Sequence, residues 1–137
     1  MTTEDQTDDK KEPVKEPTMG DKLRELLAGY DGAPSAATID GFKASHGDIF
    51  LSALNDDELF IFRALNRKEH RELNARVAEG KVPQEDLENE VVKACLLWKS
   101  IKDLDSKAGT IPSLFEQVMQ NSNFLAPQLL SNLVTKL

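Results

Sequence analysis

The residues with the clearest capacity for chemistry lie in one short polar stretch, Glu69-His70-Arg71-Glu72. It places a carboxylate two positions after an imidazole, the order His-x-Glu that some catalytic zinc sites combine with Pro-Cys-x-x-Cys. The chain has two histidines and a single cysteine, so thiolate ligands and a second histidine at helical spacing are lacking. We therefore expect no metal site and interpret His70 as part of a helix surface.

The single thiol, Cys95, falls on an apolar stripe with no histidine or helix start beside it to lower its pKa. His46 precedes Gly47, a position typical of a helix end, where an imidazole is favourable. The sequence contains no glycine-rich phosphate loop and no nucleophile elbow. We expect no catalytic residue, no cofactor and no enzymatic activity. The alternative is a thiol or acid-base enzyme whose pocket joins Cys95, His70 and a carboxylate.

A basic cluster surrounds the same stretch. Two carboxylates, Glu69 and Glu72, interleave with its cations at helical spacing, which predicts neutralising i,i+3 and i,i+4 pairs. This pattern favours a solvated helix face over a nucleic-acid patch. The cations are Arg63, Arg67, Lys68, Arg71 and Arg76.

Composition narrows the classes of partner. The 137 residues carry a net charge of -7, which disfavours binding to nucleic acid and to anionic membranes. A single cysteine excludes an intramolecular disulfide framework and fits a reducing compartment. No apolar run reaches the roughly 18 residues of a membrane span, and the acidic start does not resemble a signal peptide. We expect a cytoplasmic protein whose partners are proteins; the sequence leaves open whether it forms a homo-oligomer.

The chain divides into three parts. Residues 1–18 hold six acidic residues and three lysines with almost no bulky apolar group, so a disordered acidic tail is predicted there. Residues 19–37 contain a short amphipathic helix that Asp21 can cap, followed by a linker. This helix either packs back on the domain, the alternative we favour, or is presented to a partner. Residues 38–137 form a single domain.

A β-hairpin lies near the start of that domain. Residues 48–54 and 58–64 are rich in residues favoured in strands, and Asn55-Asp56-Asp57 forms a turn between them. Phe60 and Phe62 share one face, while Leu59 and Ile61 share the other. The hairpin is therefore either sandwiched by helices or exposes an edge that another chain can extend.

The remainder is predicted to be helical. A capping box of Asn66 and Glu69 begins one helix, and an apolar stripe from Leu87 to Trp98 marks a central helix. Thr110 is predicted to cap a third helix, and Pro127 to begin a last one that carries Leu130, Leu133, Val134 and Leu137. The fold class is α+β, mostly α, with one β-hairpin packed against about four helices.

Three blocks of the sequence resemble small tail-assembly proteins of contractile-tailed bacteriophages. The first runs from His46-Gly47 through Phe60-Ile61-Phe62-Arg63-Ala64-Leu65 to Asn66-Arg67-Lys68-Glu69-His70-Arg71-Glu72. The second is Glu90-Val91-Val92-Lys93-Ala94-Cys95-Leu96-Leu97-Trp98. The third, Ala108-Gly109-Thr110-Ile111-Pro112-Ser113-Leu114-Phe115-Glu116-Gln117-Val118-Met119, has Ile111 between the threonine and the proline of the family pattern. The blocks cover roughly residues 41 to 124.

The resemblance implies a tail-assembly or baseplate-hub chaperone, which shields apolar helical segments of a tape-measure or hub protein in the host cytoplasm. Methionine and aromatic side chains suit such adaptable apolar surfaces. Candidate contact residues are Phe115, Met119, Phe124, Leu130 and Leu133. The same residues equally fit a role in the core.

The alternative within these assemblies is a structural virion protein that is retained in the tail or baseplate. In that case the N-terminal helix would act as a clasp on a neighbouring subunit. Its contact residues would be Leu23, Leu26, Leu27 and Tyr30.

Overall fold

The computed structural model describes residues 16, 18–124 and 134–137, and within them the chain is an α+β protein with five α-helices and a four-stranded antiparallel sheet. No helix of these residues is both long and apolar enough to cross a bilayer. The predicted tail falls almost entirely outside the described residues. The elements, in chain order, are α2 (Met19–Gly29), α3 (Ala36–His46), β1 (Ile49–Asn55), β2 (Glu58–Arg63), α4 (Arg67–Ala78), the 3-10 turn η1 (Gln84–Asp86), α5 (Leu87–Cys95), β3 (Leu96–Lys99), α6 (Thr110–Asn121) and β4 (Val134–Lys136).

The predicted hairpin is confirmed as β1 and β2, the central pair of the sheet order β3-β2-β1-β4. Its turn is stabilised by the Asn55 side chain, whose Oδ1 accepts a hydrogen bond from the Asp57 amide at 2.8 Å. The predicted sheet has too few strands, because β3 extends the hairpin beside β2 and β4 extends it beside β1.

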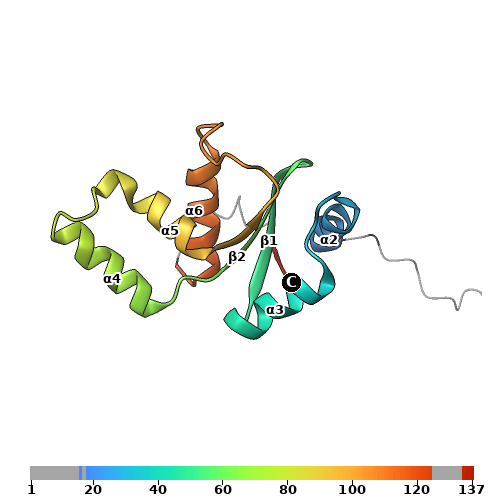
Figure 1. The fold of residues 1–137 in the computed structure, drawn as a ribbon, viewed down its shortest axis with the longest axis horizontal. Helices are drawn as coiled ribbons and strands as arrows, with labels where there is room; N and C mark the ends of the chain where they lie inside the picture. Colours follow the sequence, from blue (N-terminus) through green and yellow to red (C-terminus); the bar gives the residue numbers. More distant parts are fainter. Residues whose placement is uncertain (1–15, 17, 125–133) are drawn as a thin grey trace, which may run out of the picture.

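Helices cover both faces of this sheet (Figure 1). Leu51, Leu59 and Ile61 pack in one cluster with Leu23 and Leu27 of α2 and with the inner residues of α3. On the opposite face Phe60 and Phe62 pack against α5 and α6. The hairpin is therefore sandwiched by helices, one of the two arrangements that its doubly apolar pattern predicts.

The predicted central helix is wrong in its last turn. Helix α5 ends at Cys95, and the next residues form β3, in which Leu96 pairs with Phe62 and Trp98 with Ile61. Leu96, Leu97 and Trp98 suit a short strand as well as a helix, and pairing with the backbone of β2 decides between the two. Arg63 contributes to the helix end by donating a hydrogen bond to the Ala94 carbonyl at 2.8 Å.

The predicted C-terminal helix needs a second correction. Leu130 and Leu133 lie outside the described residues, but Val134–Lys136 form β4 instead of the end of a helix. Thr135 pairs with Leu51 of β1, and the Leu137 amide donates to the Ile49 carbonyl at 2.9 Å. The outer backbone groups of β1 need hydrogen-bond partners, and this segment supplies them.

The helix ends match the prediction at α3 and α4 and differ from it by a few residues at α2 and α6. Asn66 and Glu69 form the predicted capping box of α4, and α3 ends at Gly47 with a φ of 79°. Asp21 is the third residue of α2, where it completes a capping box begun by Thr18. Thr110 is the first residue of α6 and is buried, so the cap position belongs to Gly109.

Helix α2 packs back on the domain, as the favoured alternative predicted. Leu23 and Leu27 are buried against the sheet, and the Arg24 guanidinium donates to the Lys136 carbonyl at 2.9 Å. Gly20 permits the close approach of α2 to β4, since a Cβ atom there would lie 2.7 Å from Thr135 Oγ1. The N-terminal helix is thus part of the core.

This packing predicts a large difference between two positions of the same helix. Leu23→Ala should lower the free energy of unfolding by about 2–4 kcal/mol, because it leaves a cavity against the sheet. Met19→Ala, at a side chain that is 48% exposed, should change it by less than about 0.5 kcal/mol. Urea denaturation measures both values. Equal effects would show that α2 is not docked in solution.

Candidate functional site

The strongest polar constellation lies where β2, α4 and α5 meet. Arg63 Nη1 and Nη2 donate to Glu69 Oε1 and Oε2 at 2.8 and 2.6 Å, a bidentate pair whose side chains are 17% and 26% exposed. Hydrogen bonding to Arg63 lowers the pKa of Glu69, and the same bonds raise the pKa of Arg63. Both groups therefore stay charged over the ordinary pH range.

Almost all the hydrogen-bonding capacity of this pair is used within the fold. Arg63 also donates to the carbonyls of Ala64 and Ala94, and Glu69 Oε1 also accepts from the Asn66 amide at 3.1 Å. A hollow of about 490 Å³ lies beside the pair and is lined by Ser45, His46 and Asp48 as well. The pair is a structural clasp that holds the start of α4 to the end of β2 and the end of α5.

The groups of the alternative thiol enzyme have different surroundings. Cys95 is fully buried in a cluster with Phe62, Leu73 and Val118, and burial raises the pKa of its thiol to about 11. His70 is half-buried on α4, where its ring packs 4.8 Å from the ring of Phe124 and Nε2 lies 3.2 Å from Asn74 Nδ2. A buried, protonated thiol is a poor nucleophile. Within the described ranges, His, Cys, Asp and Glu side chains do not gather in any group of three that could hold a metal.

The predicted contact residues of α6 belong mainly to the core. Phe115 and Met119 are half-buried and pack against the cluster around Phe62 and Val118. Phe124 is 38% exposed and covers one side of His70. This end of α6 is held in place by Ser122, whose Oγ accepts from the Leu65 amide at 2.8 Å.

Helix α2, which carries the other predicted contact residues, lies on the opposite side of the sheet from α6 (Figure 1). Leu23 and Leu27 face the sheet, so little of either side chain is available to a partner. Leu26 and Tyr30 are half-buried. Tyr30 packs edge-on against Trp98 with ring centroids 6.0 Å apart, which connects the end of α2 to β3.

A groove of about 480 Å³ lies beside α2. Its volume falls within the range of about 300–1,000 Å³ that is usual for binding pockets. The groove combines apolar side chains with Arg24 and Asp31, one charge of each sign. It is lined by Arg24, Leu27, Ala28, Tyr30, Asp31, Gly32, Ala33, Pro34, Ala36, Ile39 and Leu137.

Sequence reasoning identified two of these residues, Leu27 and Tyr30, and missed the rest. Ala33 and Pro34 of the predicted linker form part of the groove wall. Leu137 was assigned to a helix, and its pairing with Ile49 brings it to the groove instead. The local pattern gives no signal for this contact, which depends on the pairing of β4 with β1.

The comparisons with known proteins identified no relative of this chain. No family model matches the chain, and neither a curated protein nor a solved structure matches it. The candidate binding surface is therefore defined by its own geometry, as an apolar groove between α2, α3 and the end of β4.

The clasp makes stability depend on pH. Glu69→Gln should lower the free energy of unfolding at pH 7 by about 1.5–3 kcal/mol, because a charged hydrogen-bonded pair is lost. The folded-state pKa of Glu69 lies below its ordinary value of 4.5, so the contribution is complete above about pH 4.5. It disappears as the pH falls through the folded-state pKa. Denaturation from pH 7 to pH 2 should show the two proteins converging in acid.

Glu72→Gln is the matched control, since Glu72 is an exposed carboxylate three residues further along the same helix. It should change stability by less than about 0.5 kcal/mol at pH 7. A similar loss in both variants would show that the loss comes from the change in helix charge and not from the Arg63–Glu69 pair.

The buried thiol predicts slow chemical modification. A rise in the pKa of Cys95 from 9.0 to about 11 reduces the thiolate fraction at pH 8 by about 100-fold. A thiol-reactive disulfide reagent should therefore label the native chain at least 100-fold more slowly than the chain unfolded in guanidinium. Rapid labelling of the native chain would reopen the thiol-enzyme alternative.

Proposed function

We propose that this chain is a non-enzymatic tail or baseplate assembly chaperone, which binds apolar helical segments of a tape-measure or hub protein. The observation that carries the proposal is the apolar groove beside α2. The three sequence blocks that resemble phage tail-assembly proteins supply the assembly context, and the groove supplies a physical means of binding.

The groove suits the side chains of an amphipathic helix. Such a helix presents apolar residues at i, i+3, i+4 and i+7, which enter a neighbouring groove as anchors. Ile39 and Leu137 offer aliphatic surface for these anchors, and Tyr30 adds an aromatic wall. The net charge of -7 keeps the loaded complex soluble by mutual repulsion.

The alternative is a structural subunit that stays in the tail or baseplate. In this alternative α2 would bind a neighbouring subunit through side chains that include Leu23 and Leu27. Both side chains are buried in the isolated chain, so this binding would have to remove them from the core at a cost of about 1.5–3 kcal/mol each. Docking in the preformed groove avoids that cost.

The groove is tested by filling it. Ala28 and Ala36 are exposed groove residues on α2 and α3, so Ala28→Glu/Ala36→Glu adds bulk and charge without disturbing the core. Tagged full-length protein from the producing cells should co-purify with a tail protein that contains long helices, identified by mass spectrometry. The double variant should recover at least tenfold less of it.

Ala37→Glu/Ala44→Glu is the control, because both residues are exposed on α3, neither lines the groove, and the change in net charge is the same. It should recover the partner at the wild-type level. If the groove variant recovers as much partner as the wild type does, the binding surface lies elsewhere.

Mass spectrometry of finished particles separates the chaperone from the structural subunit. A chaperone should be present in lysate complexes and absent from purified particles. Retention of the chain in particles at fixed stoichiometry would support the structural alternative, and failure to recover any tail protein would contradict the phage assignment.

A further inference from the structure

Helix α4 has an unusual position and charge for this protein. It projects to the far side of the molecule from α2 (Figure 1), and Leu73 is its one buried residue. Its twelve residues carry four cations and two carboxylates, a local charge of +2 on a chain whose net charge is -7.

The solvated face that the sequence predicted is present, but the predicted i,i+3 and i,i+4 ion pairs do not form among the described residues of α4. Glu69 turns inward to Arg63, and Arg76 is engaged by Glu90 of α5 at 3.4 Å. Among the described residues, no carboxylate lies within ion-pair distance of Arg67, Lys68 or Arg71. The outer face thus presents three cations and the carboxylate of Glu72.

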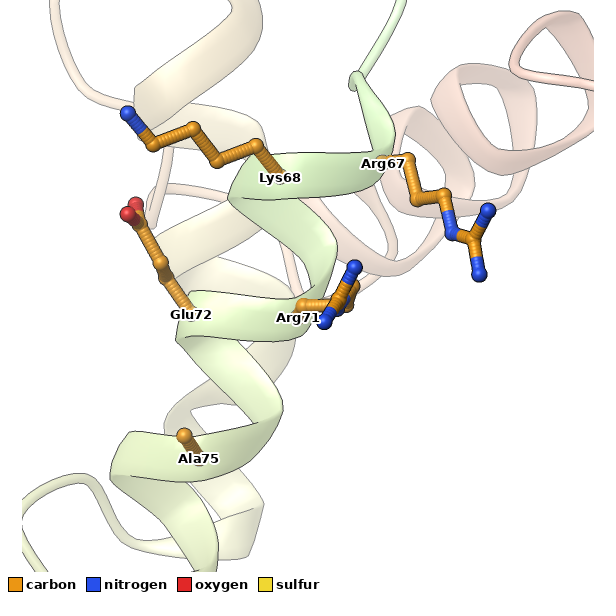
Figure 2. A pocket seen from close by; sticks show the side chains of 5 residues that line it. All are labelled: Arg67, Lys68, Arg71, Glu72 and Ala75. Carbon is orange, nitrogen blue, oxygen red and sulfur yellow. The ribbon is translucent and has the colours of Figure 1, made fainter.

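These side chains border a hollow of about 700 Å³, which is lined by Arg67, Lys68, Arg71, Glu72 and Ala75. In Figure 2 Arg67 and Arg71 extend to one side of the helix, Lys68 and Glu72 extend to the other, and the short Ala75 side chain lies one turn below. Arg67 and Arg71 are separated by one helical turn, as are Lys68 and Glu72.

We propose that this outer face of α4 binds an acidic amphipathic helix of a partner protein. Carboxylates one turn apart on such a helix match Arg67 and Arg71 by charge, and Arg suits bidentate pairing with carboxylate. The small Ala75 side chain allows two helix axes to approach to about 8–10 Å. Glu72 selects a partner that also carries a cation among its carboxylates.

A protein partner fits better than a nucleic acid. Nucleic-acid affinity depends on neutralising many phosphates, and three cations on a chain of net charge -7 provide little of this. Glu72 would also oppose a phosphate backbone, whereas it can pair with a lysine on a protein helix. The surface is separate from the groove beside α2, so the proposal does not rest on the proposed chaperone function.

Fluorescence anisotropy with the full-length chain tests the proposal. The probe is a labelled 18-residue alanine-based helical peptide with glutamates at i, i+4 spacing and one lysine. It should bind in the micromolar to millimolar range at 50 mM NaCl, and several-fold more weakly at 300 mM because salt screens exposed charges. A peptide of the same length with glutamine in place of every glutamate should bind at least tenfold more weakly, because it lacks the carboxylates that pair with Arg67 and Arg71.

Arg67→Glu/Arg71→Glu should weaken binding of the acidic peptide at least tenfold. Lys43→Glu/Lys102→Glu is the control for net charge, because it makes the same change of -4 at exposed residues away from α4. It should weaken binding less than twofold. Unchanged circular dichroism and melting temperature establish that both variants fold, and Ala28→Glu/Ala36→Glu should bind the peptide like the wild type.

Three outcomes would overturn the proposal. Equal losses in the two charge-reversal variants would assign binding to the overall field of the protein. Tighter binding of a single-stranded oligonucleotide than of the acidic peptide would assign the face to nucleic acid. Binding that appears after Asp8→Lys/Asp9→Lys, and not after the same +4 change at exposed residues in Glu25→Lys/Asp40→Lys, would show that the chain's own acidic tail is the occupant instead of an external partner.

Discussion

The structure depends on a hairpin that is apolar on both faces. Leu51, Leu59 and Ile61 on one side, and Phe60 and Phe62 on the other, have no exposed surface or almost none. A two-stranded hairpin of this kind cannot persist alone in water, because each face exposes apolar area that favours burial by about 25 cal/mol per Å². The three layers follow from this requirement. Helices α2 and α3 cover one face, and α5 and α6 cover the other.

A buried hydrogen bond fixes one of these layers over the sheet. Ser52 Oγ of β1 donates to Gln117 Oε1 of α6 at 2.5 Å, and both residues are fully buried among apolar neighbours. Apolar contacts alone tolerate sliding of a helix over a sheet, whereas a buried polar group must keep its partner. The pair therefore specifies where α6 sits along β1. Residues that α6 holds in the core, including Phe115 and Met119, are correspondingly less available to partners.

The features that the sequence predicted are those determined by local spacing. The hairpin, the Asn66–Glu69 capping box and the helix end at Gly47 need only neighbours within a few residues, and the structure has all three. The errors concern segments whose state is decided by distant pairing. Leu96–Lys99 and Val134–Lys136 become strands because β2 and β1 have open edges, which the segments themselves do not reveal. The groove was missed for the same reason, since it joins the α2–α3 linker to Leu137 across more than 100 residues.

The two candidate surfaces are attached to this sandwich by different forces. Helix α2 is held by the burial of Leu23 and Leu27, an attachment that salt and mild acid hardly change. Helix α4 has one buried side chain, Leu73, and its first turn depends on the pair of Arg63 with Glu69. Conditions that weaken ion pairs should therefore loosen α4 before they affect the groove beside α2. The groove is then an apolar surface that salt and mild acid hardly change, and α4 is a charged helix whose position responds to electrostatics. A partner that engaged both would be held by apolar contacts on one side of the sheet and would be selected by charge on the other.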